Sequence, residues 1–207
     1  MCQFKSAIVV HDERCKGGYR LLMSPWTESH SELMTIHQIK DGSRLNFARV
    51  EFSPPSMEVA HLPDGYVLKI DEGRTPDWFG AEMKDRVTDE MRDYIRRMIV
   101  SGDVELLIGG QFIVAPGAKV ECAKAMVINA ICGGTVSEIW GGTVSEICGG
   151  TVSEIWGGTV LEIWGGTVLE IWGGTVSAIR GGTVSAIRGG TVSEIRGGTV
   201  NNDYRKK

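Results

Sequence analysis

The chain lacks several features that would place it at once in a class of proteins. Among its 207 residues, no apolar run approaches the roughly 18 residues of a membrane-spanning helix. The N-terminus has no long apolar segment of the kind found in signal peptides. A net charge of −4 is far from the strongly basic balance of a nucleic-acid-binding protein. We therefore expect no membrane partner and do not favour nucleic acid as a partner.

Cysteine and histidine are scarce and scattered. The five cysteines are odd in number and include no C-x-x-C pair, which argues against a disulfide scaffold and favours a cytoplasmic protein with free thiols. The four histidines show none of the spacings of a zinc site. No P-loop, G-x-G-x-x-G or H-E-x-x-H motif is present. The sequence therefore predicts a cytoplasmic location, no metal and no cofactor.

Glycine, in contrast, is abundant and unevenly placed. Of 28 glycines, 21 lie after residue 108, whereas all six prolines lie before residue 117 and all four histidines before residue 62. The cause is an octapeptide, GGTV-x-x-I-x, that runs nine times from Gly133, with the isoleucine kept in eight copies. The composition break predicts two domains. We predict an N-terminal domain over 1–108, a repeat domain over 109–204 (degenerate over 109–132, regular over 133–204), and a basic tail over 205–207.

The octads favour extended structure over helix. A Gly-Gly pair in every octad would cost a helix about 2 kcal/mol per repeat relative to alanine, and threonine, valine and isoleucine prefer strands. One short strand cannot bury a face alone, so successive coils should stack at about 4.8 Å with glycines at the corners. We predict a mainly β chain whose C-terminal part is a β-solenoid with about two octads per coil. Three octads per coil is the alternative.

Two arrangements are possible for the side chains of each octad that point into the solenoid. Val136 and Ile139 are three residues apart, so a regular strand would place them on opposite faces. We expect both to point inward, which requires a bend between Ser137 and Glu138. In the alternative, Thr135, Ser137 and Ile139 face the interior of a thin solenoid.

This pattern is similar in its logic to the left-handed hexapeptide and square pentapeptide β-helices, although an eight-residue period matches neither. The opening MCQFKSAIV followed by a glycine-rich octad array also resembles octapeptide-repeat proteins that recur in gut bacterial and phage genomes. The resemblance covers nearly the whole chain. It implies no particular activity.

The N-terminal domain reads as a small α+β unit. We expect it to cap the open sheet edge of the solenoid, because an uncovered edge invites unwanted pairing. Thr75-Pro76-Asp77 is typical of a helix start, with a cap, a proline in the first turn and an acidic residue. The expected strands are 3–10, 18–23, 45–52, 65–71 and 103–108, and the expected helices run from Thr27 or Ser29 to Ile39 and from Thr75 to Val100.

The eighth position of the octads carries the candidate binding residues. Tryptophan and arginine are enriched at interface hot spots, and monomers usually avoid exposed runs of tryptophan. We therefore expect a homo-oligomer, a dimer above all, or an unidentified protein partner; stabilisation by stacking alone is the alternative reading. With two octads per coil, one edge stacks Trp140, Trp156, Trp172, Arg188 and Tyr204, and the other stacks Cys132, Cys148, Trp164, Arg180 and Arg196.

Charge along the repeats offers two further interpretations. A modest basic patch is expected at the end of the array, formed by its arginines with Arg205, Lys206 and Lys207. It would bind phosphate or simply aid solubility. The row of glutamates at the sixth position offers, as an alternative, a DNA mimic that inhibits a nucleic-acid-binding protein. From Gly133 onward, however, six Glu and one Asp stand against four Arg and two Lys, which is a net charge of only −1. A solvated face is favoured in both cases.

Three sites have a chemical interpretation that we weigh against a structural one. Removal of Met1 would expose Cys2 as the nucleophile of a small hydrolase, with the solenoid as an oligomerisation stalk. His30, between Ser29 and Ser31, is better explained by a helix cap than by a Ser–His pair. Cys132 and Cys148 would stack within disulfide reach, and we expect them to be reduced. A non-enzymatic protein is favoured.

Overall fold

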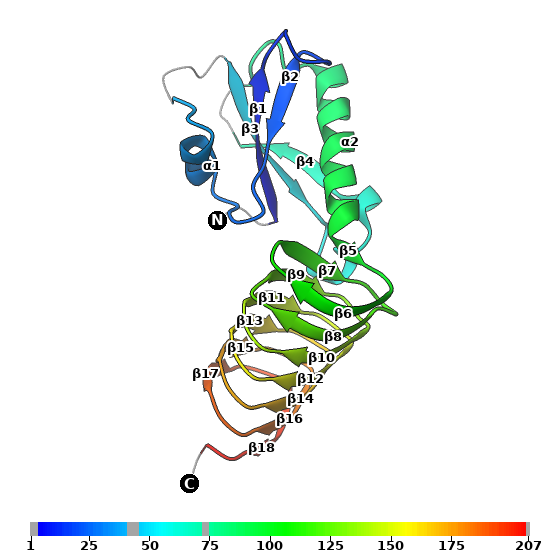
Figure 1. Cartoon of the computed structure of the whole chain (residues 1–207), viewed down its shortest axis with the longest axis vertical. Helices are drawn as coiled ribbons and strands as arrows, with labels where there is room; N and C mark the ends of the chain where they lie inside the picture. The colour runs from blue at the N-terminus through cyan, green and yellow to red at the C-terminus, as the bar shows by residue number, and fades with distance from the viewer. Residues whose placement is uncertain (1–3, 41–45, 72–74, 206–207) are drawn as a thin grey trace. The chain divides into compact units, whose positions relative to one another are not determined.

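The computed structural model describes residues 4–40, 46–71 and 75–205. The chain forms two compact units, the first comprising Met1–Pro55 with Leu62–Arg97 and the second Ser56–His61 with Met98–Lys207 (Figure 1). The chain is mainly β, as predicted. Cys2, Lys206 and Lys207 lie outside the described residues. Within the described part, neither helix combines the length and the apolar character needed to cross a membrane.

The first unit is built on a four-stranded antiparallel sheet of order β2-β1-β3-β4. Strand β1 is covered on both faces of the sheet, because five consecutive residues of this strand, Lys5 to Val9, are buried. Leu33 and Met34 of the first helix pack with Phe47 in the core on one face. The elements are β1 (Lys5–His11), β2 (Tyr19–Leu22), α1 (His30–Ile36), β3 (Phe47–Ser53), η3 (Pro63–Gly65), β4 (Val67–Ile70) and α2 (Ala81–Met98).

The predicted helix start at Thr75-Pro76-Asp77 is wrong. Those residues lead into a turn in which the Phe79 N–H donates to the Pro76 carbonyl at 2.9 Å, and the helix begins at Ala81. Aromatic packing explains the delay, because Phe79 is buried and Trp78 stacks on the His11 ring with centroids 5.1 Å apart. The predicted ends are also too late: α2 stops at Met98, and α1 stops at Ile36.

The second unit is a solenoid of two seven-stranded parallel sheets, of order β18-β16-β14-β12-β10-β8-β6 and β17-β15-β13-β11-β9-β7-β5. Thr135 pairs with Thr151, 16 residues later, so each coil holds two octads, as predicted. The first coil begins at Ile99, upstream of the Gly109 start read from the repeat. The strands are β5 (Ile99–Val100), β6 (Asp103–Ile108), β7 (Gln111–Val114), β8 (Lys119–Lys124), β9 (Val127–Ile131), β10 (Thr135–Ile139), β11 (Thr143–Ile147), β12 (Thr151–Ile155), β13 (Thr159–Ile163), β14 (Thr167–Ile171), β15 (Thr175–Ile179), β16 (Thr183–Ile187), β17 (Thr191–Ile195) and β18 (Thr199–Asp203), and η2 (Met57–Val59) also belongs to this unit.

The valine and isoleucine of the octad both point inward. Val136 and Ile139 are 0% and 1% exposed, whereas Thr135 and Ser137 are half-buried. The pairing of β10 with β12 includes the threonine, valine, glutamate and isoleucine but skips Ser137, which marks the bend. Two inward side chains per strand therefore stack into one continuous core, and the alternative with inward hydroxyls is wrong.

Close packing of the corners explains the two invariant glycines. Gly158 has a φ of +81°, and a Cβ built there would lie 2.5 Å from the Gly142 carbonyl oxygen. The other glycine of that corner, Gly157, would place a Cβ 2.8 Å from the Trp140 oxygen. This corner rests directly on the backbone of the coil before it, so a side chain has no room at either position. At Gly141, by contrast, a Cβ would meet nothing within 4 Å.

Candidate binding surface

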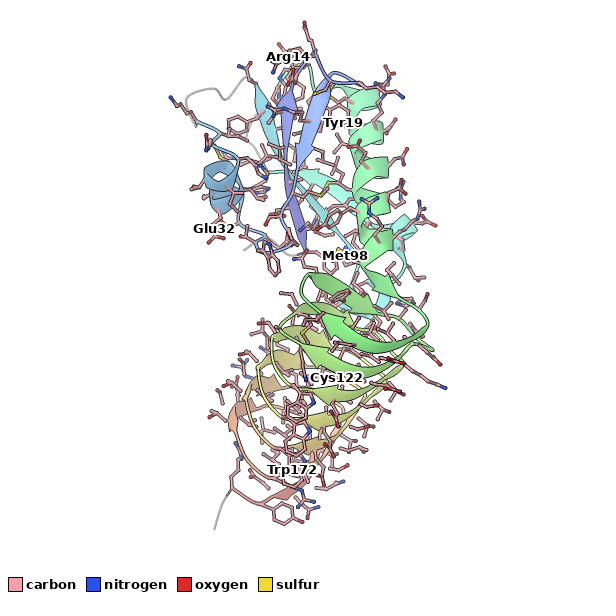
Figure 2. The ribbon with its side chains drawn as sticks, in the orientation of Figure 1. Arg14, Tyr19, Glu32, Met98, Cys122 and Trp172 are labelled. Atoms are coloured by element: carbon pink, nitrogen blue, oxygen red, sulfur yellow. The ribbon has the colours of Figure 1, made fainter. Side chains whose placement is uncertain are left out.

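Large side chains at the eighth position stack along one side of the solenoid (Trp172 is labelled in Figure 2). The rings of Trp140, Trp156 and Trp172 lie face to face, with neighbouring centroids 5.5 and 5.3 Å apart and interplanar angles of 15° and 6°. Each ring follows a strand that pairs in register with the next coil, which holds successive rings near the inter-strand spacing of about 4.8 Å. The stacking order derived from two octads per coil is therefore present.

Cations and a tyrosine extend this stack at both ends. Lys124 Nζ lies 5.3 Å from the centroid of the Trp140 ring. The Arg188 guanidinium carbon lies 4.8 Å from the Trp172 centroid and 5.4 Å from that of Tyr204. The sequence reasoning missed the lysine, although Lys124 is the eighth residue of a degenerate octad. We call the stack of Lys124, Trp140, Trp156, Trp172, Arg188 and Tyr204 the tryptophan ladder.

The indole N–H groups of Trp140 and Trp156 are hydrogen-bonded within their own repeats. The indole N–H of Trp140 donates to Glu138 at 2.6 Å, and that of Trp156 donates to Glu154 at 2.8 Å. In these two octads, the glutamate two residues before the ring accepts the hydrogen bond from the only donor of the indole. Trp140, Trp156 and Trp172 nevertheless remain 48%, 38% and 39% exposed. What they present to solvent is therefore largely carbon, in a strip that runs along the solenoid.

The stack on the other edge of the solenoid contains fewer aromatic side chains and is more polar. The Arg180 guanidinium carbon lies 5.1 Å from the centroid of the Trp164 ring. The Trp164 N–H and the Arg180 Nη2 both donate to Glu162, at 2.6 and 2.7 Å. We call the stack of Cys132, Cys148, Trp164, Arg180 and Arg196 the mixed ladder.

The repeat arginines are bound to repeat glutamates. Arg188 Nη2, for example, lies 2.6 Å from Glu170 Oε1 in the preceding coil. Hydrogen bonds from the arginines hold the pKa of Glu162 and of Glu170 below the ordinary glutamate value. Because a carboxylate offsets the charge of each of these three arginines, they offer little free positive charge for a phosphate, and the same pairing disfavours an acidic DNA mimic. The pairs are Arg180–Glu162, Arg188–Glu170 and Arg196–Glu194.

The two cysteines of the mixed ladder are partly buried thiols with raised pKa values. Burial raises the pKa of Cys132, and burial together with Glu146 raises the pKa of Cys148 to about 12. Cys132 Sγ donates to the Met57 carbonyl at 3.2 Å, and both cysteines are free, as expected. A nucleophilic cysteine needs a stabilised thiolate, so neither residue has the environment of a catalytic thiol.

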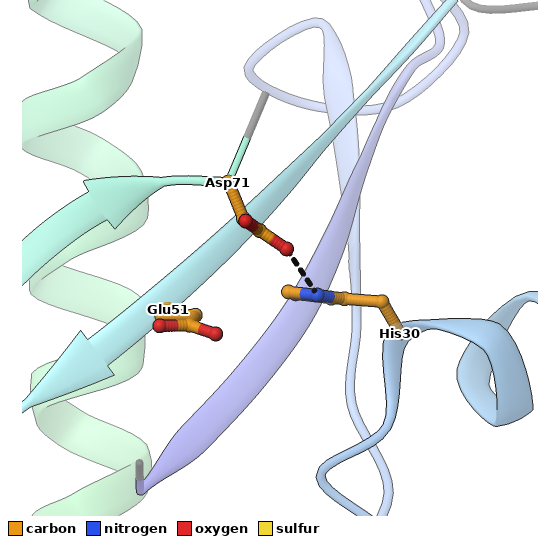
Figure 3. A group of neighbouring side chains, drawn as sticks. All are labelled: His30, Glu51 and Asp71. Carbon is orange, nitrogen blue, oxygen red and sulfur yellow. Dashed lines mark ion pairs between the residues drawn. The ribbon is translucent and has the colours of Figure 1, made fainter. Parts of the chain in front are cut away.

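The remaining candidates of the sequence have separate outcomes. Ser29 is the N-cap of α1, and its Oγ accepts from the Glu32 N–H at 3.4 Å, which confirms the helix-cap interpretation. Cys2, the candidate nucleophile, lies outside the described residues. Among the residues that the structure describes, one group joins three metal-ligating side chains, those of His30, Glu51 and Asp71 (Figure 3). Sequence spacing gave no signal for this group because its members come from three different elements.

No protein-family model, curated protein or solved structure matches the chain. Its function is therefore inferred from its own geometry.

Proposed function

We propose that the solenoid is a non-enzymatic scaffold and that its tryptophan ladder binds a second copy of this chain. The observation that carries the proposal is the strip of three stacked, partly exposed indoles, in which the N–H donors of Trp140 and Trp156 are already bonded inside the repeat. A strip with satisfied polar atoms loses little when it is desolvated. Burial of its carbon surface is favourable at about 25 cal/mol per Å².

The geometry favours a protein partner over nucleic acid. Proteins that bind single-stranded nucleic acid stack bases on the faces of aromatic rings. In the tryptophan ladder these faces are covered by neighbouring rings or by the cations at its ends. The outer edges of the indoles remain, and they suit packing against another apolar surface.

The order of residues along the tryptophan ladder favours a second copy. A two-fold axis placed between Trp156 and Trp172 sets two ladders antiparallel, as an isologous dimer requires. Trp156 then meets Trp172 of the other copy, Trp140 meets Arg188, and Lys124 meets Tyr204. Every cation faces an aromatic ring, an arrangement that stabilises an interface. An axis through Trp156 itself would instead set Lys124 against Arg188, so charge selects the first register.

End-to-end association is less favoured. The last strand, β18, replaces the usual residues of the octad with Asn201, Asn202 and Asp203. Asp203 pairs with Ile187 of the preceding coil and forms an ion pair of 2.7 Å with Arg205. Charged residues on an edge strand oppose further strand pairing. The side of the solenoid, rather than its C-terminal end, is the better surface for a partner.

The test is light scattering on a sizing column, with substitutions that the repeat already accepts. Arginine occurs naturally at the eighth position and pairs with the glutamate of the coil before it. The double variant Trp156→Arg with Trp172→Arg keeps that pairing but sets arginine against arginine in the proposed register. We expect a dimer for the wild-type chain and a monomer for the double variant.

Trp164→Arg in the mixed ladder is the matched control and is expected to remain a dimer. Circular dichroism of all three chains checks that the solenoid is folded. A monomeric wild-type chain at every concentration, or a control that dissociates as readily as the double variant, would overturn the proposal.

A further inference from the structure

Three metal-ligating side chains meet on one face of the first unit's sheet (Figure 3). His30 begins α1, Glu51 lies in β3, and Asp71 directly follows β4. Their ligand atoms all lie within 4.8 Å of one another, and His30 Nδ1 is 3.2 Å from Asp71 Oδ2. The backbone holds Asp71 in place, because its N–H donates to the Arg49 carbonyl at 2.9 Å.

The second ring nitrogen of His30 sets the tautomer. His30 Nε2 lies 3.1 Å from the Val50 carbonyl oxygen, and a carbonyl oxygen only accepts, so this nitrogen carries the hydrogen. In the neutral ring, Nδ1 then presents a lone pair toward the carboxylates. Such an arrangement calls for a proton shared between Nδ1 and a carboxylate, or for a cation such as a metal ion between them. Metal-bound histidines characteristically donate their other N–H to a backbone carbonyl or a carboxylate.

A buried hydroxyl beside the cluster gives an independent indication. Ser6 stands directly opposite Glu51 in the pairing of β1 with β3, so both side chains lie on the same face of the sheet. Ser6 is 0% exposed, and its Oγ has no hydrogen-bond partner among the described residues. A buried hydroxyl without a partner is costly. Water bound to a metal ion on this face would supply that partner.

We propose that His30 Nδ1, Glu51 and Asp71 bind one zinc ion, with a fourth position open to water. Mixed nitrogen and oxygen donors suit zinc, whereas calcium and magnesium take oxygen ligands. Tetrahedral bonds of about 2.0–2.1 Å separate two ligand atoms by about 3.3 Å, close to the observed 3.2 Å between Nδ1 and Oδ2. The Asp71 side chain is 57% exposed, which gives an ion a path from solvent.

A nearby lysine is the competing source of positive charge. Lys69 pairs with Glu51 across β3 and β4, and its side chain is exposed. An exposed ammonium keeps its hydration and gains little from such a contact. A zinc ion held by three ligands would therefore displace it.

Zinc titration of the full chain at neutral pH, in competition with a chromophoric chelator, tests the site. We expect one ion per chain and a raised unfolding temperature with zinc. Asp71→Asn and Glu51→Gln should each weaken binding by about tenfold or more, since even the loss of a group that only hydrogen-bonds to a metal ligand costs that much. Glu32→Gln removes an exposed carboxylate two residues after His30 and is expected to leave the affinity unchanged.

Three results would overturn the proposal. Absence of stoichiometric binding would mean that a proton on Nδ1, or Lys69, supplies the charge. Equal affinity in the Asp71→Asn and wild-type chains would place the ion elsewhere. A strong thiolate-to-metal absorption band in the cobalt-loaded chain would assign the ion to cysteine.

Discussion

The two units satisfy their polar groups at very different depths below the surface. In the solenoid, a glutamate bonds a tryptophan two residues away or an arginine one coil away, and both partners lie at the surface. In the first unit, Lys5 is 0% exposed, and its Nζ donates to the Ser24 carbonyl at 2.6 Å and to Glu28 at 2.9 Å. Burial lowers the pKa of Lys5. We therefore expect substitutions in the solenoid to cause local and graded losses of stability, and substitutions around Lys5 to cause severe losses.

The largest effect is expected from Glu28→Ala. The substitution leaves the ammonium of Lys5 buried without its carboxylate, and breaking a buried pair costs about 3–5 kcal/mol. Hydrogen exchange of peptides from β1 and β3 measures the loss, because local opening free energies in the sheet should fall together.

Lys5→Met is the matched comparison. It removes the buried charge at similar volume and leaves Glu28, whose side chain is 22% exposed, bonded to the Ser6 N–H at 2.7 Å. We expect a clearly smaller loss than for Glu28→Ala. Equal losses from the two variants would mean that lost contacts, rather than an unpaired charge, dominate.

The next largest effect is expected at a solenoid corner. Gly158→Ala forces a Cβ onto the Gly142 oxygen at 2.5 Å, in a backbone region that costs L-residues about 1–2 kcal/mol before any clash. We expect a loss of at least about 2 kcal/mol in urea unfolding.

Gly141→Ala is the control, since its φ is not positive and its Cβ would meet nothing within 4 Å. Its cost should be small. If Gly141→Ala loses as much stability as Gly158→Ala, the glycines at the corners act through backbone flexibility rather than through close packing.

Repetition, which the solenoid has and the first unit lacks, explains how much of the structure could be predicted from the sequence. Nine near-identical octads favoured the observed coil size, the inward valine and isoleucine, and the order of the stacked side chains, because most copies share one environment. The last coil departs from it, since Ile195 is 49% exposed. The first unit offers no such averaging. The helix start at Thr75 was mispredicted because burial of Phe79, a tertiary effect, outweighs a good capping sequence. His30, Glu51 and Asp71 meet only when three elements fold together, and no sequence spacing records that.

The smallest expected effect concerns Glu146, a glutamate beside the mixed ladder. Glu146 has Cys148 two residues later, where other octads have a tryptophan or an arginine, and burial together with Glu162 raises its pKa. A raised folded-state pKa contributes stability below the unfolded value, and that contribution is lost as pH rises through the folded value. Glu146→Gln should therefore unfold at a higher temperature than the wild-type chain at neutral pH and at the same temperature in acid.

Glu162→Gln should behave in the opposite way. The hydrogen bond from Arg180 lowers the pKa of Glu162, so its stabilisation is present above the unfolded value and is lost as pH falls through the folded value. This variant should melt earlier than the wild-type chain at neutral pH, and the difference should vanish in acid. Thermal unfolding of the two variants from neutral to acidic pH measures this contrast. Glu162 accepts a hydrogen bond from an arginine, whereas Glu146 has no such charged donor in its octad. Parallel pH profiles would show that the eighth-position side chain does not determine how each octad holds its glutamate.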